Sequence, residues 1–97
     1  MLESYIERWL TEEVKSAGGL SVKLAPTLAG LPDRLVFLPA GRLYLVELKT
    51  DTGRVRPVQA AMHKRLRQLG FDVRVVRGME EARAFVGEVC GGAVSSE

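Results

Sequence analysis

The sequence predicts an α/β domain in which helices flank a four-stranded mixed sheet, in the order α-β-β-β-α-β. Apolar residues recur at three- and four-residue intervals over residues 2–17 and 57–69, which is typical of amphipathic helices. Short apolar or alternating runs bounded by glycine and proline predict four strands, at residues 20–24, 33–38, 43–49 and 72–76. The strand–helix–strand unit from residue 43 to 76 implies a parallel, right-handed crossover, and the first three strands are expected to form an antiparallel meander.

Glycine and proline mark the ends of these elements. Gly18-Gly19 ends the first helix, and Pro39-Ala40-Gly41 predicts a hairpin turn between the second and third strands. Pro57 suits the first position of the second helix, which Gly70 ends. We expect the apolar face of that helix to contain Val58, Ala61, Met62, Leu66 and Leu69. A last helix is predicted over residues 79–89.

Length and composition favour one small globular domain. With 97 residues and 46% hydrophobic content, we expect a single domain over residues 1–90 and a flexible tail over 91–97. No apolar run approaches the roughly 20 residues needed to span a membrane. The single cysteine, Cys90, excludes an intramolecular disulfide, and the single histidine, His63, argues against a structural zinc site. These features favour a cytoplasmic protein.

The net charge of +2 is unevenly distributed. Residues 49–77 carry eight lysines and arginines against two aspartates, a net charge of +6, whereas the flanking segments are acidic on balance. A phosphate-binding surface needs such a basic block, although a solvated helix face would also account for it. The candidates for phosphate contacts are Arg34, Arg54, Arg56, Lys64, Arg65 and Arg67.

Acidic and basic side chains are expected to meet on the third predicted strand. Glu47 and Lys49 are two residues apart, so they project from the same face, while Leu48 points into the core. Asp33, at the mouth of the preceding strand, could reach the same place. Two carboxylates can hold a divalent cation, and the lysine beside them can orient a water. The alternative is a plain ion pair, but the apolar run before Glu47 indicates a strand buried on both faces, where a charge needs a partner or a metal.

Helical residues could complete such a site. On a helical wheel Glu3 projects within the apolar stripe of the first helix and Glu7 lies at its edge. Either could be the acid of the site, and the alternative for Glu3 is an exposed first-turn acid favoured by the helix dipole. Gln59, in the first turn of the second helix, could reach a metal-bound water or a phosphate, or be an ordinary helix glutamine.

Three segments in this order carry a family resemblance. Gly-Leu-Pro-Asp-Arg-Leu (30–35), Val-Glu-Leu-Lys-Thr (46–50) and Val58-Gln59 opening a helix together resemble the VRR-NUC domain, over about residues 3–86. That family belongs to the PD-(D/E)XK nuclease superfamily. The resemblance implies a restriction-endonuclease-like core, dependence on Mg²⁺ or Mn²⁺, and cleavage of DNA phosphodiesters.

The resemblance also implies roles and partners. Asp33 and Glu47 would bind the metal with the backbone carbonyl of Leu48, and Glu3 would complete the site, while Lys49 and Gln59 would be catalytic. Small stand-alone members resemble Holliday-junction resolvases, so we expect a homodimer acting on branched DNA such as four-way junctions, encoded by a bacterium or a phage. The sequence does not locate the interface of such a dimer, but it offers two aromatic candidates for its exposed side, Trp9 and Phe85.

Other functions remain compatible with the sequence. One is a nuclease of flaps, nicks or duplex DNA without junction preference. Another is an RNA-directed nuclease, although the basic block has no aromatic residue on which splayed bases would stack. A third is a nucleic-acid-binding module without activity. The last is disfavoured by the intact set of Asp33, Glu47 and Lys49, because a pure binder does not need clustered acids that repel phosphate.

Overall fold

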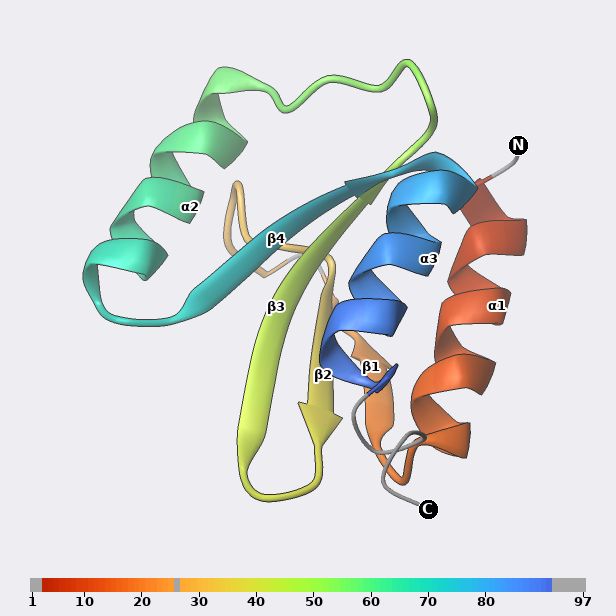
Figure 1. The fold of residues 1–97 in the computed structure, drawn as a ribbon. Coiled ribbons are helices and arrows are strands. Elements are labelled where there is room, and N and C mark those ends of the chain that lie inside the picture. The colour runs from red at the N-terminus through yellow and green to blue at the C-terminus, as the bar shows by residue number, and fades with distance from the viewer. Residues whose placement is uncertain (1–2, 26, 92–97) are drawn as a thin grey trace.

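The computed structural model describes residues 3–25 and 27–91 (Figure 1). Its elements follow the predicted order, and their ends differ from the predicted ones by a residue or two. They are α1 (Glu3–Ser16), β1 (Leu20–Lys23), β2 (Arg34–Leu38), β3 (Arg42–Lys49), α2 (Pro57–Gln68), β4 (Asp72–Arg77) and α3 (Gly78–Val89). Nearly all of the predicted tail, residues 92–97, lies outside the described residues.

The strands form one sheet in the order β1-β2-β3-β4. Strands β1, β2 and β3 pair antiparallel, and β4 pairs parallel to β3 after the chain has crossed over through α2. The predicted meander and crossover are therefore confirmed. Strand β3 therefore lies in the interior of the sheet, with an antiparallel neighbour on one side and a parallel neighbour on the other.

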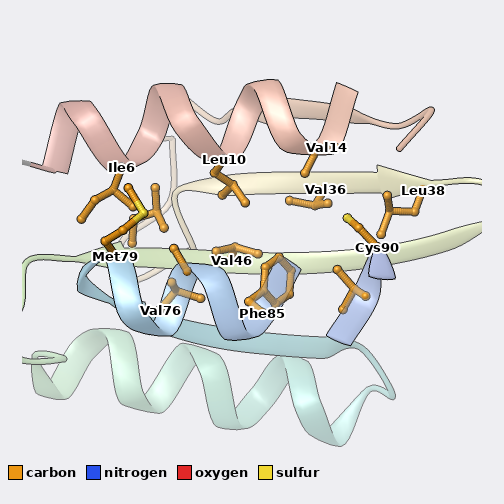
Figure 2. Close-up of a cluster of buried hydrophobic side chains, with 13 residues drawn as sticks. Ile6, Leu10, Val14, Val36, Leu38, Val46, Val76, Met79, Phe85 and Cys90 are labelled. Carbon is orange, nitrogen blue, oxygen red and sulfur yellow. The ribbon is translucent and has the colours of Figure 1, made fainter. Parts of the chain in front are cut away.

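Helices cover the two faces unequally, with α1 and α3 side by side on one face and α2 on the other (Figure 1). The main apolar core lies under α1 and α3, as Figure 2 shows. Each large apolar side chain that is removed from water there contributes about 1.5–3 kcal/mol to folding. The core members labelled in Figure 2 are Ile6, Leu10, Val14, Val36, Leu38, Val46, Val76, Met79, Phe85 and Cys90.

Two expectations about exposed and buried faces are wrong. Phe85 is 4% exposed and belongs to the core, so it offers no aromatic surface, whereas Trp9 packs against that core and is partly exposed. On α2 the buried residues are the polar Gln59 and His63, whereas Val58 and Leu69 are 46% and 67% exposed. The helix is turned so that a polar pair one turn apart faces the sheet, because Glu47 of β3 binds Gln59 there.

None of the helices in the described ranges has the length and apolar character needed to cross a membrane.

Candidate active site

Strand β3 brings two charged side chains to the face of the sheet that α2 covers. Leu45, Val46, Glu47 and Leu48 are all buried, as the apolar run before Glu47 predicts. Val46 and Leu48 point to α1 and α3, where they join the core. Glu47, only 5% exposed, points to the opposite face with Lys49, whose Nζ lies 3.3 Å from Glu47 Oε2.

Gln59 holds the Glu47 carboxylate in place. Its amide Nε2 donates a hydrogen bond of 3.0 Å to Glu47 Oε2. Its carbonyl Oε1 accepts from the backbone N–H of Arg56 at 2.9 Å, which also satisfies a donor at the start of α2. Both ends of the amide are therefore engaged by the protein. These two bonds fix the orientation of Gln59 against Glu47, at the wall of the pocket described below.

Asp33 immediately precedes β2 and approaches Glu47 from the neighbouring strand. Its Oδ2 accepts a hydrogen bond of 3.3 Å from the backbone N–H of Leu48. Burial, and then the negative charge of Glu47, raise the pKa of Asp33 to about 7. The two carboxylates thus repel each other across β2 and β3, and a cation between them would relieve that repulsion.

Each carboxylate has one oxygen held by the protein and one oxygen without a partner. Asp33 Oδ1 and Glu47 Oε1 are both buried and make no hydrogen bond within the described residues, although buried polar atoms are normally paired. Unpaired carboxylate oxygens next to each other are the donors that hard divalent cations prefer. Asp33 and Glu47 therefore fit an Mg²⁺ or Mn²⁺ ion.

The first helix contributes acids to the vicinity, with different partners. Glu3, exposed in the first turn of α1, is near enough for its charge to contribute to the raised pKa of Asp33. Glu7 instead binds the guanidinium of Arg34 and lies 3.4 Å from Lys23 Nζ. Of the two predicted candidates, Glu3 is thus the one whose charge acts on the site.

The acids alone do not form a closed metal cage. In the described part of the chain, no three histidine, cysteine, aspartate or glutamate side chains are grouped closely enough to hold a metal ion. Mg²⁺ commonly retains several waters and uses one or two carboxylates. An ion bound by Asp33 and Glu47 would therefore keep open positions for water and substrate, and Glu3 would act through a water.

A pocket of about 460 Å³ leads to the acids. Residues 24, 25 and 27–33 line it together with Arg56, Val58 and Gln59 at the start of α2, and Glu47 is also part of its lining. Gly30 permits this close approach. Its φ is +86°, and a Cβ there would lie 2.5 Å from the carbonyl oxygen of Val58 on α2.

Two of the predicted phosphate-binding residues have hydrogen-bond partners within the protein, and the other four are exposed. Arg34 is buried, 3% exposed, and donates to Glu7 and to the hydroxyl of Ser21, so the expectation of a surface phosphate contact is wrong for this residue. Arg67 is exposed, but its Nη2 donates to the carbonyl of Val73 at 2.8 Å. The remaining candidates are exposed, namely Arg54, Arg56, Lys64 and Arg65.

Sequence reasoning missed two residues next to the site. His63, one turn after Gln59 on the same side of α2, is 1% exposed, and its Nε2 has no partner among the described residues. Burial lowers its pKa, opposed by the charge of Glu47. Arg77 is paired with Lys49 across β3 and β4, and its Nε donates to the carbonyl of Gly53 at 3.0 Å. The four-residue spacing of Gln59 and His63 was the available signal; nothing local indicated Arg77.

This chain is similar to known proteins. The family model of the VRR-NUC domain matches residues 7–80. A protein named "Putative nuclease p44", from Acyrthosiphon pisum secondary endosymbiont phage 1, is 41% identical over 75 residues, which cover 76% of this chain and 81% of that protein. A solved structure described as a VRR_NUC domain aligns with a TM-score of 0.82 and 30% identity, and covers 90% of this chain and 96% of its own.

The family match spans well over half of the chain and includes Asp33, Glu47, Lys49 and Gln59. The solved structure extends the similarity to the whole four-stranded fold. This chain therefore belongs to the VRR-NUC domain family.

Proposed function

We propose that this protein is a metal-dependent DNA endonuclease that hydrolyses phosphodiester bonds at the site around Asp33 and Glu47. The observation that carries the proposal is the pair of buried oxygens, one on each carboxylate, that have no partner in the described part of the chain. The lysine 3.3 Å from Glu47 supplies the positive group that phosphoryl chemistry needs beside such a pair. Membership of the VRR-NUC family and the similarity to a phage protein named as a nuclease support the same conclusion.

The residues would share the work of the reaction. Asp33 and Glu47 would hold the ion, with the backbone carbonyl of Leu48 as a further ligand and Glu3 acting through a water. A bound Mg²⁺ or Mn²⁺ supplies polarisation of the phosphate and a lowered pKa of the attacking water. Lys49 would orient that water, because an ammonium group has donors left after its contact with Glu47, and would stabilise the charge that develops on the phosphate.

Gln59 would act as a positioning residue. Its hydrogen bond fixes the orientation of Glu47, and the second end of its amide is tied to the backbone of α2. Residues that orient metal ligands in this way typically change metal affinity or activity 10- to 100-fold when they are lost. Arg56, which is exposed and lines the pocket, and the exposed Arg54 of the preceding loop would contact neighbouring phosphates.

We further propose branched DNA, such as a four-way junction, as the preferred substrate, with a homodimer as the active species. One chain offers one candidate site, and one site cuts one strand. Two symmetric cuts need two sites related by a two-fold axis, which a C₂ dimer provides. The main alternative is a monomer that nicks duplex or flap DNA with the same chemistry.

The test is cleavage of a substrate panel by the purified protein. Labelled four-way junction, flap, linear duplex, single-stranded DNA and single-stranded RNA would be incubated with Mg²⁺, Mn²⁺ or EDTA. We expect metal-dependent cleavage, fastest on the junction, and loss of cleavage in Glu47→Gln. Cleavage in EDTA, or full activity of Glu47→Gln, would contradict the proposed site. Equal rates on junction and linear duplex would leave a general nuclease, and binding without cleavage of any substrate would leave a binding module.

A further inference from the structure

The pocket that contains the acidic pair also has an apolar part that cleavage chemistry does not use. Arg56 is the one cation among its described lining residues. Most of the other lining residues are apolar, among them Leu24, Leu28, Leu31 and Val58. A phosphodiester backbone is bound through lysine, arginine and polar hydrogen-bond donors. A phosphate at the acids therefore does not account for the apolar part of the pocket.

Two of the apolar lining residues are largely open to solvent. Leu28, in the loop before β2, is 58% exposed, and Val58, in the first turn of α2, is 46% exposed. Single exposed apolar residues are ordinary on soluble proteins, but these two line the same pocket as Asp33 and Glu47. Ligand sites commonly combine apolar surface of this kind with a few polar groups.

The segments that carry Leu28 and Val58 are held together. Gly30 lies so close to α2 that an added Cβ would be 2.5 Å from the carbonyl oxygen of Val58. The backbone N–H of Leu24 donates a hydrogen bond of 2.8 Å to the carbonyl of Asp33, which joins the two ends of the loop. The pocket is therefore built into the fold, as is usual for sites of small ligands.

The volume of the pocket, about 460 Å³, limits the size of its ligand. It lies within the range of roughly 300–1,000 Å³ that is typical of sites for small molecules and cofactors. A DNA duplex is too large to enter, since its major groove alone is about 12 Å wide. The faces of paired bases are also covered by their neighbours in the stack. Only an unpaired nucleotide can therefore present the apolar face of a base to this pocket.

We propose that the pocket receives the base of one unpaired nucleotide, next to the phosphate that is cleaved. The proposal rests on the proposed function and assigns the feature of branched DNA that the site would recognise. The base would lie against Leu28 and Val58, as enzymes that act on an extruded nucleotide hold its base between aromatic or apolar side chains. The exposed Arg56 would contact a phosphate of the same strand.

The position of the acids links the proposed base contact to the reaction. Asp33 and Glu47 belong to the same lining as Leu28 and Val58, and their unpaired oxygens are the proposed metal ligands. A matched duplex would have to open locally before one strand could contact both parts of the pocket, and opening costs least where a base is already unpaired. The pocket thus favours cleavage beside an unpaired nucleotide over cleavage within a matched duplex.

Fluorescence anisotropy with three labelled DNAs tests the proposal in EDTA, where the proposed function predicts no cleavage. The first DNA is a matched duplex, the second carries one additional unpaired adenine, and the third carries an abasic residue in place of that adenine. The abasic DNA keeps the backbone of the second but lacks the base. We expect the wild type to bind the adenine bulge about fivefold more tightly than the other two. Stacking of a base on an aromatic side chain changes affinity roughly 5- to 150-fold, and an aliphatic contact belongs at the lower end.

Leu28→Ser and Val58→Ser remove the proposed base contact, and Leu69→Ser is the control. Leu69, directly after the last residue of α2, is 67% exposed and does not line the pocket. We expect both pocket variants to lose the preference for the adenine bulge and to bind the matched duplex as the wild type does. The control should bind all three DNAs like the wild type. Circular dichroism checks the folding of these exposed-site variants, and either pocket variant that folds is sufficient for the test.

Two results would overturn the proposal. Equal affinity of the wild type for the adenine bulge and the abasic DNA would give the pocket a different occupant, and a folded pocket variant that keeps the preference would place the base elsewhere. Cleavage of the same DNAs in Mn²⁺ separates this proposal from the proposed function. Cleavage with no preference for the bulge retains the nuclease alone, whereas a preference in binding without any cleavage retains the base pocket alone.

Discussion

The two carboxylates of the candidate site each combine a fixed oxygen with an unsatisfied one. Glu47 Oε2 is held by Gln59 and Lys49, and Asp33 Oδ2 by the backbone of Leu48. Fixing one oxygen sets the direction of the other, so the proposed cation would meet two oxygens that are already oriented. The buried Gln59 thus has a polar partner on the sheet, whereas Val58 and Leu69 of the same helical segment are exposed.

Gln59→Leu should raise the Mg²⁺ concentration that cleavage requires while changing the stability of the fold little. The variant keeps a side chain of similar size but removes the hydrogen bond to Glu47 Oε2. We expect the Mg²⁺ concentration for half-maximal cleavage to rise about 10- to 100-fold, measured by initial rates over a metal titration. Gln68→Leu, at the exposed end of the same helix, is the control. An unchanged metal dependence in Gln59→Leu would show that Glu47 does not need this support.

Asp33→Asn should remove a pH dependence of stability. The pKa of Asp33 is about 7 in the fold against an ordinary 3.8, so between these values the folded state binds more protons than the unfolded state. Wild-type stability contributed by this group is therefore lost as the pH rises towards 7. With solvent screening, we expect the metal-free Asn variant to gain on the order of 1–2 kcal/mol relative to wild type between pH 4 and pH 8.

Chemical denaturation of the metal-free proteins at several pH values would measure this difference. Added Mg²⁺ should stabilise the wild type more at pH 8 than at pH 5, because the ion competes with a proton for Asp33. A constant difference between wild type and Asp33→Asn across this range would contradict the raised pKa.

At the scale of the elements, the loop before β2 and the first turn of α2 must approach closely for the pocket to exist. Gly30 adopts a φ of +86°, and a Cβ would lie 2.5 Å from the carbonyl oxygen of Val58. The positive φ disfavours any residue with a side chain, and the short distance leaves no room for a Cβ unless the loop shifts. The glycine of the Gly-Leu-Pro-Asp segment therefore places Asp33 opposite Gln59.

Gly30→Ala should cost stability, whereas Gly87→Ala in α3 should not. A strained backbone and a contact with a backbone carbonyl together cost roughly 1–3 kcal/mol. A Cβ added to Gly87 would meet no atom of the described residues within 4 Å, and this glycine lies inside a helix, where alanine is favoured by roughly 0.5–1 kcal/mol. Urea unfolding of both variants measures the contrast. Equal free energies of unfolding in the two variants would show that the close contact of Gly30 with α2 does not constrain the residue at this position.

The proposed phosphate contacts belong to the scale of the whole molecule, because nucleic-acid affinity is the sum of many such contacts. We expect Lys64→Gln with Arg65→Gln to reduce the log–log salt slope of duplex binding by about 1.8, since each phosphate contact contributes about 0.9. Arg83→Gln, exposed on α3, is the control. Fluorescence anisotropy across a salt series measures the slopes. An unchanged slope in the double variant would assign these residues to a solvated face.

The sequence predicts the fold and only part of the site, for physical reasons. Strand alternation has a fixed period, so Glu47 and Lys49 share a face in any sheet, and the crossover rule fixes the relation of β3 to β4. The rotation of α2 about its axis depends on which residues meet the sheet, so its exposed Leu69 and its bond from Gln59 to Glu47 were not predictable.

Long-range pairing is equally hidden from a single sequence. The ion pair of Glu7 with Arg34 joins α1 to β2, and it engages an arginine that was expected to contact phosphate. The exposure of Leu20 and Phe37 was not predictable, because alternation along a strand gives no sign of whether a helix covers that face of the sheet. Whether a helix packs on a given part of the sheet depends on how the helices and the sheet assemble, and not on the sequence of one strand.

The central claim is that Asp33 and Glu47 together hold a divalent cation, and Mn²⁺ titration followed by electron paramagnetic resonance tests it most directly. Free Mn²⁺ would be measured with wild type, Asp33→Asn, Glu47→Gln and a control, Glu80→Gln, on the exposed surface of α3. We predict one bound Mn²⁺ per chain in the wild type and the control, and at least about 100-fold weaker binding in either site variant. Wild-type affinity in Asp33→Asn and Glu47→Gln would contradict the metal site.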